Sequence, residues 1–172
     1  IATCQQLDEA AGREVFVKCE NLQKVGAFKY RGASNAVMQL NLEQASAGVV
    51  THSSGNHAQA LALAARQRSI PAWIVMPSNA PQIKQDAVAD YGATIVLCEP
   101  TLEARETTAA EIVAQQQATF IHPYNNAHVM AGQATVGAEI LEQVTQLDAI
   151  VAPVGGGGLL AGIALAAEAL QP

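Results

Sequence analysis

The sequence predicts an α/β fold of open, mainly parallel sheets covered by helices. Short runs rich in valine and isoleucine alternate with longer Ala-rich runs, at the spacing typical of βαβ units. The strand-like runs are continuously apolar rather than alternating, and this indicates strands that are buried on both faces. Helices must therefore lie on both sides of the predicted sheet.

Each element is predicted from its local composition. The β-rich runs place strands at residues 15–19, 48–52, 73–76, 95–98, 120–122 and 150–154. The Ala-rich runs place helices at residues 31–40, 57–68, 102–117, 130–144 and 159–170. A further helix opens near Ala80 and Pro81, where proline suits a first helical turn. No linker, repeat or low-complexity tract marks a domain boundary.

The bulk composition excludes several classes of protein. Of the 172 residues, 50% are hydrophobic and 14% are charged, which is a globular balance. The net charge is −6 and the basic residues are scattered, so we expect neither nucleic acid nor a membrane as partner. No apolar run is long enough to cross a bilayer, and no signal peptide is visible. The three widely spaced cysteines favour reduced thiols and a cytoplasmic protein.

The strongest local motif is a run of four glycines between a predicted strand and a predicted helix. The run consists of Gly155, Gly156, Gly157 and Gly158, and Leu159 follows it. Without side chains, successive backbone N–H groups can approach one anion, and the helix N-terminus adds partial positive charge. A phosphate group is the natural ligand. A dinucleotide site and a plain tight turn are the alternatives, and the absence of a following Gly-Lys-Ser/Thr excludes a Walker loop.

A second polar loop, residues 51–57, also lies between a strand and a helix. Ser53, Ser54, Gly55 and Asn56 offer hydroxyls, an amide and free N–H groups at one helix terminus. This arrangement suits a carboxylate or a second anion, with ordinary helix capping as the alternative. The spacing of His52 and His57 matches no metal site, so no metal ligands are predicted.

The third motif surrounds one of only four lysines. Lys29 lies between Phe28 and Tyr30, in a segment that glycines flank on both sides. Partial burial would lower its pKa and favour the neutral amine that attacks an aldehyde. Taken alone, the segment is more typical of an ordinary lysine whose stem lies along apolar surface.

These three motifs occur together, in this order, in fold-type II pyridoxal-phosphate enzymes, whose fold is like that of the tryptophan synthase β subunit. The chain resembles the serine racemase and threonine dehydratase family over essentially its whole length. The resemblance includes residues 18–20 and 26–33, the loop 53–57 and the glycines 155–158. It implies a lyase or isomerase that dehydrates or racemises small hydroxy amino acids such as L-serine or L-threonine. The sequence does not decide between the two substrates or the two reactions.

The resemblance also implies a role for each candidate residue. Lys29 would carry the cofactor covalently and move the substrate's α-proton, and Ser54 would act on the opposite face. Phe28 and Asn56 would contact the cofactor ring. The glycines 155–158, with Leu159, would bind its phosphate. Ser53, Ser54, Gly55 and His57 would surround the substrate carboxylate.

Enzymes of this family are longer than this chain. The resemblance therefore implies a fold incomplete at both ends, in a fragment, a truncated gene product or a chain that another chain completes. Residues 1–47 and 126–172 would be parts of a large cofactor-binding domain, and residues 48–125 a small α/β domain. A homodimer is implied, and so is a divalent-cation site in full-length relatives, with ligands outside this chain. A non-catalytic remnant that binds a phosphate ligand or a partner chain is the alternative.

Overall fold

A parallel four-stranded sheet organises the computed structural model, which describes residues 1–171. Its strand order is β5-β4-β3-β6. The strands are β3 (Val49–His52), β4 (Ala72–Pro77), β5 (Thr94–Cys98) and β6 (Thr119–Phe120). All three pairings are parallel, so each connection must cross over the sheet. The predicted fold class is confirmed.

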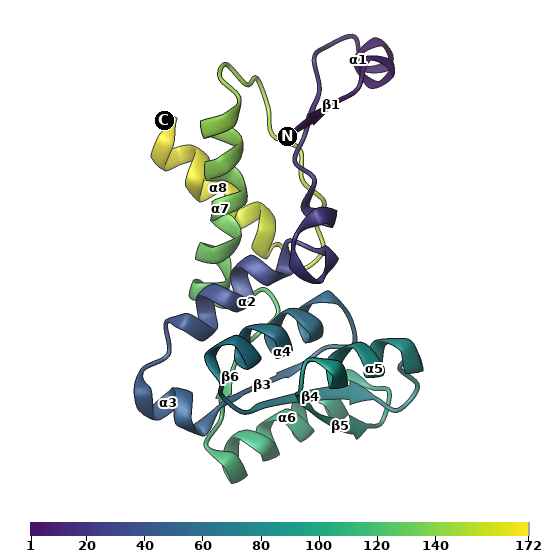
Figure 1. Cartoon of the computed structure of the whole chain (residues 1–172), viewed down its shortest axis with the longest axis vertical. Coiled ribbons are helices and arrows are strands. Elements are labelled where there is room, and N and C mark those ends of the chain that lie inside the picture. The colour runs from purple at the N-terminus through teal and green to yellow at the C-terminus, as the bar shows by residue number, and fades with distance from the viewer. Residues whose placement is uncertain (172) are drawn as a thin grey trace.

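Helices cover both faces of this sheet (Figure 1). On one face lie α4 (Asn56–Arg68) and α5 (Gln82–Asp90), and on the other lies α6 (Leu102–Gln116). Successive residues of β3 explain why both faces need cover. Val49 belongs to the hydrophobic cluster under α4, while Val50 belongs to the cluster under α6. Both valines are fully buried, as the continuous apolar run predicted.

A group of three helices packs beside the sheet layer. It consists of α2 (Lys29–Met38), α7 (Ala127–Gln143) and α8 (Gly158–Leu170). Helix α2 packs against both α4 and α7 and so links the two parts (Figure 1). Glycines bring these helices close together: a Cβ added at Gly132 of α7 would lie 2.5 Å from the Arg31 carbonyl oxygen and 2.6 Å from the Gly32 Cα. Gly162 of α8 similarly faces the α7 backbone, which supports a packing role for it.

Several short elements fall outside the predicted set. They are β1 (Ala2–Thr3), α1 (Gln5–Ala11), the 3₁₀ turns η1 (Glu20–Leu22) and η2 (Lys24–Gly26), and α3 (Leu42–Ala47). The strand predicted at residues 15–19 corresponds to β2 (Phe16–Val17). It is shorter than expected, exposed, and paired antiparallel with β1 rather than placed in the parallel sheet. β2 pairs only with β1 and lies outside the parallel sheet, so no layer of helices covers its side chains.

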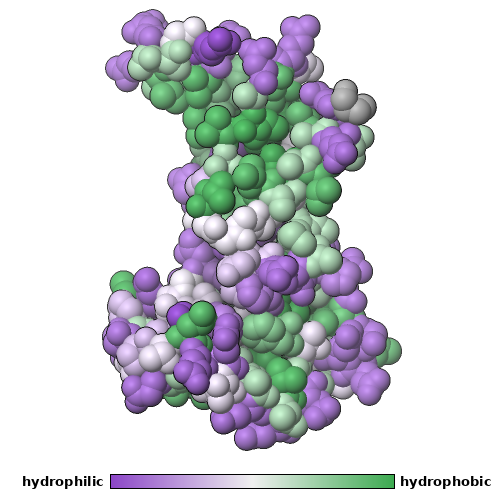
Figure 2. All heavy atoms as spheres, turned by 180° about the vertical axis from the view of Figure 1, so that it is seen from behind, coloured by the Kyte–Doolittle hydropathy of each residue, from purple (hydrophilic) through white to green (hydrophobic). Residues whose placement is uncertain are grey.

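The prediction of a strand at residues 150–154 is wrong for the described residues. The segment has no regular secondary structure, and Val151 is 95% exposed. Within residues 1–171 no strand pairs with it, and the side chains of Val151 and Val154 stay exposed. Hydrophobic residues gather on the surface of the half that holds α7 and α8 (Figure 2), where Leu160, Leu165 and Leu170 are exposed.

Two further structural findings concern the whole described chain. Among residues 1–171, no helix is both long enough and apolar enough to cross a membrane. Cys4, Cys19 and Cys98 are free thiols. The predicted division into two domains stays a prediction, although the four-stranded sheet lies entirely within residues 48–125.

Candidate active site

The site lies at the carboxyl edge of two neighbouring strands. β3 and β6 are parallel and paired, so the residues that follow them emerge at the same edge of the sheet. The loop Ser53–Gly55 follows β3 and leads into α4, while the segment Ile121–Tyr124 follows β6. The edge therefore brings together two polar segments from distant parts of the sequence.

Lys29 is the first residue of α2 and points toward this edge. Its amine donates a hydrogen bond of 2.6 Å to the carbonyl oxygen of Pro123, in the segment after β6. Its Nζ also lies 5.4 Å from the centre of the Phe28 ring. Burial lowers the pKa of Lys29 below its ordinary value of 10.5, because desolvation penalises the charged form. The predicted shift toward a neutral amine is confirmed in direction.

One small cavity joins Lys29 to the glycine turn. It has a volume of about 170 Å³ and is lined by Phe28, Lys29, Tyr124, Pro153, Gly155, Gly156, Gly157, Gly158 and Leu159. Residues more than a hundred positions apart in sequence thus share one site. The amine and the glycines lie on the same face of the molecule, as the proposed covalent chemistry requires.

The glycine turn has one crowded side and one open side. A Cβ at Gly156 would lie 2.2 Å from the Tyr124 ring, and one at Gly158 would lie 2.9 Å from the Tyr124 carbonyl oxygen. At Gly155 and Gly157 an added Cβ would meet nothing within 4 Å. Gly157 also has φ of +84°, which glycine adopts without strain. In the described chain, no backbone N–H from Gly155 to Leu160 donates a hydrogen bond to the protein.

The loop after β3 presents a second set of free donors. Asn56 begins α4, and within residues 1–171 the N–H groups of Asn56, His57 and Ala58 have no protein acceptor. Ser53 Oγ accepts a hydrogen bond of 3.3 Å from the Gly55 N–H, which shapes the loop. The loop does not line the cavity around Lys29. Both sites nevertheless contact the segment 121–123, because Lys29 binds the Pro123 carbonyl and His57 lies against the Ile121 carbonyl.

His57 is deeply buried, unlike most of the predicted site residues. It is 2% exposed, and its Nε2 lies 3.2 Å from the Ile121 carbonyl oxygen, to which it can donate. Burial, followed by the positive charge of Lys29, lowers the pKa of His57 to about 3. The ring is therefore neutral at ordinary pH. Its Nδ1 is buried without a protein partner among the described residues.

Two residues of the site, Tyr124 and Pro153, were not among the predicted binding residues. Tyr124 and Pro153 both line the cavity. The backbone N–H groups of Tyr124 and Asn125 donate to His122 Nδ1, at 3.2 and 2.9 Å, which fixes the turn that carries the tyrosine. The adjacent His122-Pro123 pair was the available signal for Tyr124, while Pro153 lies in the segment predicted as a strand.

Comparison with known proteins identifies the family. The family described as "Pyridoxal-phosphate dependent enzyme" matches residues 1–172. The chain belongs to this family. A crystal structure of serine racemase from Dictyostelium discoideum is 50% identical and superposes with a TM-score of 0.96, covering 99% of this chain and 56% of that one. The beta-hydroxyaspartate dehydratase of Paracoccus denitrificans is 51% identical over 100% of this chain and 55% of its own length.

A more distant relative has the same fold. The processed form of threonine deaminase isoform 2 from Solanum lycopersicum is 39% identical with a TM-score of 0.95, covering 99% of this chain and 47% of its own. These neighbours confirm fold type II. The chain spans about half the length of the curated relatives it matches.

The residues present fit the family's cofactor, pyridoxal phosphate. A phosphate needs several N–H donors without intervening side chains, and the glycine turn has free donors and an open side. An aldehyde needs a neutral amine nearby, and Lys29 lies in the same cavity with a lowered pKa. The N–H donors, the open side of the glycine turn and the Lys29 amine thus all suit pyridoxal phosphate.

Proposed function

We propose that the protein containing this chain uses pyridoxal phosphate to eliminate water from, or to racemise, small β-hydroxy amino acids. The observation that carries the proposal is the shared cavity of Lys29 and the glycines 155–158. L-serine and L-threonine are the proposed substrates, and the names of the related racemase, dehydratase and deaminase support this chemical class.

The cofactor, when bound, supplies an electron sink that stabilises negative charge at the substrate's α-carbon. The chain's own residues supply position and proton transfer. We assign covalent attachment and removal of the α-proton to Lys29, whose lowered pKa provides a neutral amine. Ser54 would hold or deliver a proton on the opposite face. Phe28 would pack against the ring, and Asn56 would bind its phenolic oxygen.

Anion binding is divided between two helix termini. The free N–H groups of the glycine turn and of Leu159, at the start of α8, would hold the phosphate. The free N–H groups at the start of α4, with Ser53 and Gly55, would hold the substrate carboxylate. The His57 ring is neutral and engaged with Ile121, so we assign its backbone N–H rather than its side chain to carboxylate binding.

Borohydride trapping tests the attachment residue. The protein is incubated with pyridoxal phosphate, reduced, digested and analysed by mass spectrometry, and Lys29 should carry the label. Lys29→Ala should abolish labelling, while Lys84→Ala, which changes an exposed lysine, should leave it intact. A label on Lys18, Lys24 or Lys84 instead would show that the cavity is not the cofactor site.

Release of keto acid tests the reaction. The protein should form pyruvate and ammonia from L-serine, or D-serine if racemisation prevails. A protein that is labelled at Lys29 but transforms neither L-serine nor L-threonine would instead be a binding remnant. Tighter binding of a dinucleotide than of pyridoxal phosphate would favour the nucleotide alternative.

We further propose a homodimeric, cytoplasmic protein. The exposed apolar surface over α7 and α8 supports additional polypeptide packed there, and three free thiols fit a reducing compartment. A divalent cation, if used, would bind elsewhere in the protein, since residues 1–171 contain no group of three or more His, Cys, Asp or Glu suited to one. Sedimentation analysis and metal analysis of the purified protein test these points.

A further inference from the structure

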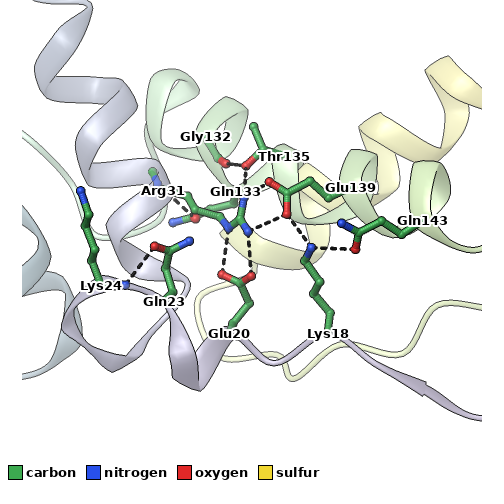
Figure 3. A network of polar contacts seen from close by, with 11 residues as sticks. Lys18, Glu20, Gln23, Lys24, Arg31, Gly132, Gln133, Thr135, Glu139 and Gln143 are labelled. Carbon is green, nitrogen blue, oxygen red and sulfur yellow. Dashed lines mark hydrogen bonds and ion pairs between the residues drawn. The ribbon is translucent and has the colours of Figure 1, made fainter. Parts of the chain in front are cut away.

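A four-residue ionic cluster surrounds the start of the helix that carries Lys29. It consists of Lys18, Glu20, Arg31 and Glu139 (Figure 3). Lys18 and Glu20 come from the N-terminal segment, Arg31 from the first turn of α2, and Glu139 from α7. The cluster therefore joins three separate parts of the chain at Arg31, which follows Lys29 by two residues.

Arg31 is the centre of this cluster. Its Nε and Nη2 each lie 2.8 Å from a Glu20 carboxylate oxygen. Its Nη1 and Nη2 bind the two Glu139 oxygens at 2.6 and 2.8 Å, and Nη1 also donates to Thr135 Oγ1 at 3.0 Å. A guanidinium that binds two carboxylates through paired N–H groups has its orientation fixed by geometry as well as by charge.

The cluster is shielded from solvent more than a typical surface pair. The side chains of Arg31 and Glu20 are 13% and 16% exposed. In contrast, the Arg13–Asp148 pair, at 3.5 Å, has side chains that are 77% and 89% exposed. Screening weakens the exposed pair far more than the enclosed one. The exposed Arg13–Asp148 pair can therefore serve as a control for the enclosed pairs of Arg31.

The backbone beside Arg31 is also held. The Gly32 N–H donates to Gln133 Oε1 at 3.2 Å, and the Arg31 carbonyl oxygen faces Gly132 across the tight helix contact. The first turn of α2 is consequently fixed on two sides, by the ionic cluster and by α7. Lys29 begins this turn, so its Cα position follows from the same contacts.

We propose that Arg31 is a positioning residue for Lys29, holding the first turn of α2 so that the amine reaches the glycine turn. The proposal rests on the proposed function, in which Lys29 attaches the cofactor. Without the arginine, the first turn would shift on α7, and the lysine stem would reach solvent instead of the partly enclosed cavity. The amine would then be charged more often at neutral pH.

The test compares three arginine variants of the full chain by pH-dependent borohydride trapping of pyridoxal phosphate on Lys29. Arg31→Gln should move the pH of half-maximal labelling upward by about one unit and reduce labelling at pH 7 about tenfold. Arg13→Gln removes only the exposed pair and should match the unchanged protein. Arg68→Gln loosens the other end of α2, where Arg68 donates to the Val37 and Leu40 carbonyls, and should lower thermal stability without moving the midpoint.

The outcomes separate position from general stability. An unchanged midpoint in Arg31→Gln, or an equal shift in Arg68→Gln, would overturn the positioning role. If Arg31→Gln does not fold, Glu20→Gln removes one carboxylate partner and should shift the midpoint in the same direction by less; no shift would overturn the proposal. Absence of any Lys29 label in the unchanged protein would instead refute the proposed function itself.

Discussion

The Lys29 amine and the Pro123 carbonyl oxygen are joined by a hydrogen bond of 2.6 Å. The bond connects the first turn of α2 with the segment that follows β6. It also gives the buried amine a polar partner that carries no charge. Burial lowers the pKa of Lys29, since no carboxylate compensates for the lost hydration.

This pKa direction predicts unusual reactivity of Lys29. Only a neutral amine attacks acetic anhydride, so at pH 8 a trace amount of reagent should acetylate Lys29 ahead of Lys24 and Lys84. Competitive labelling followed by mass spectrometry gives the rate at each lysine as pH rises. The Lys29 rate should level off below pH 10.5, its ordinary pKa. Slower labelling of Lys29 than of Lys84 would show that access, rather than charge, controls it.

The contact between Gly156 and Tyr124 predicts a specific loss of phosphate binding. In Gly156→Ala the new Cβ would overlap the Tyr124 ring, displacing either the ring or the turn. We expect affinity for pyridoxal phosphate to fall by roughly tenfold or more, equivalent to about 1.4 kcal/mol. Affinity for pyridoxal, which has no phosphate, should change little.

A double variant identifies the cause of that loss. The double variant Tyr124→Ala with Gly156→Ala lacks the overlapping ring. Its affinity for pyridoxal phosphate should therefore be close to that of Tyr124→Ala alone, so that Gly156→Ala costs little affinity once the ring is removed. Fluorescence titration with both ligands measures each corner of the cycle. Strictly additive losses would mean that the added methyl group acts on the turn itself.

The helix contact at Gly132 predicts a loss of stability. A Cβ there would meet the backbone of Arg31 and Gly32, which cannot rotate away as a side chain can. Gly132→Ala should therefore lower the free energy of unfolding by about 1–3 kcal/mol, as overpacking does. Gly155→Ala adds the same methyl group where nothing lies within 4 Å, and should change stability little. Urea denaturation of both variants tests the difference.

Burial of His57 predicts loss of stability in mild acid. Its pKa is about 3 in the folded chain against an ordinary 6.5, so below pH 6.5 the unfolded chain binds a proton that the folded chain does not. The free energy of unfolding is thus unaffected by His57 titration above pH 6.5. It declines as the pH falls from 6.5 toward 3, by at most about 1.4 kcal/mol per pH unit. His52 and His122, whose pKa values are also lowered chiefly by burial, act in the same direction.

The His57 contribution can be isolated by substitution. His57→Gln should be less stable at pH 7, because it loses the bond to Ile121, yet should show a shallower decline between pH 6.5 and 4. His128→Gln, at an exposed position, serves as the control. An equal acid slope in His57→Gln and the unchanged protein would contradict the assignment.

The parallel sheet was predictable because local and tertiary requirements agree along the chain. Val49 and Val50 face opposite sides of the sheet, and a continuous apolar run is the direct mark of such burial. The segment 150–154 is similarly apolar but has no strand beside it in residues 1–171. Pairing depends on a neighbour, and composition alone does not supply one. Helix α3 was missed, although the Asn41 and Gln44 capping box marks its start.

The site was only partly predictable. Lys29 and the glycines 155–158 were predicted as site residues because each motif joins two elements and resembles a known family, and the structure brings them into one cavity. The Pro123 carbonyl could not be found, because any residue type provides a backbone oxygen. The Arg31–Glu139 pair spans 108 residues, so it follows from the packing of α2 on α7 and from no local pattern.

Two cations and two carboxylates make up the cluster beside Lys29, so their charges cancel. Burial is the cause of the lowered pKa of Lys29, and none of these charged side chains contributes to it. A shift caused by neighbouring charge fades when added electrolyte screens it, whereas one caused by dehydration persists. The reactive form of the amine should thus stay equally abundant from dilute buffer to molar sodium chloride.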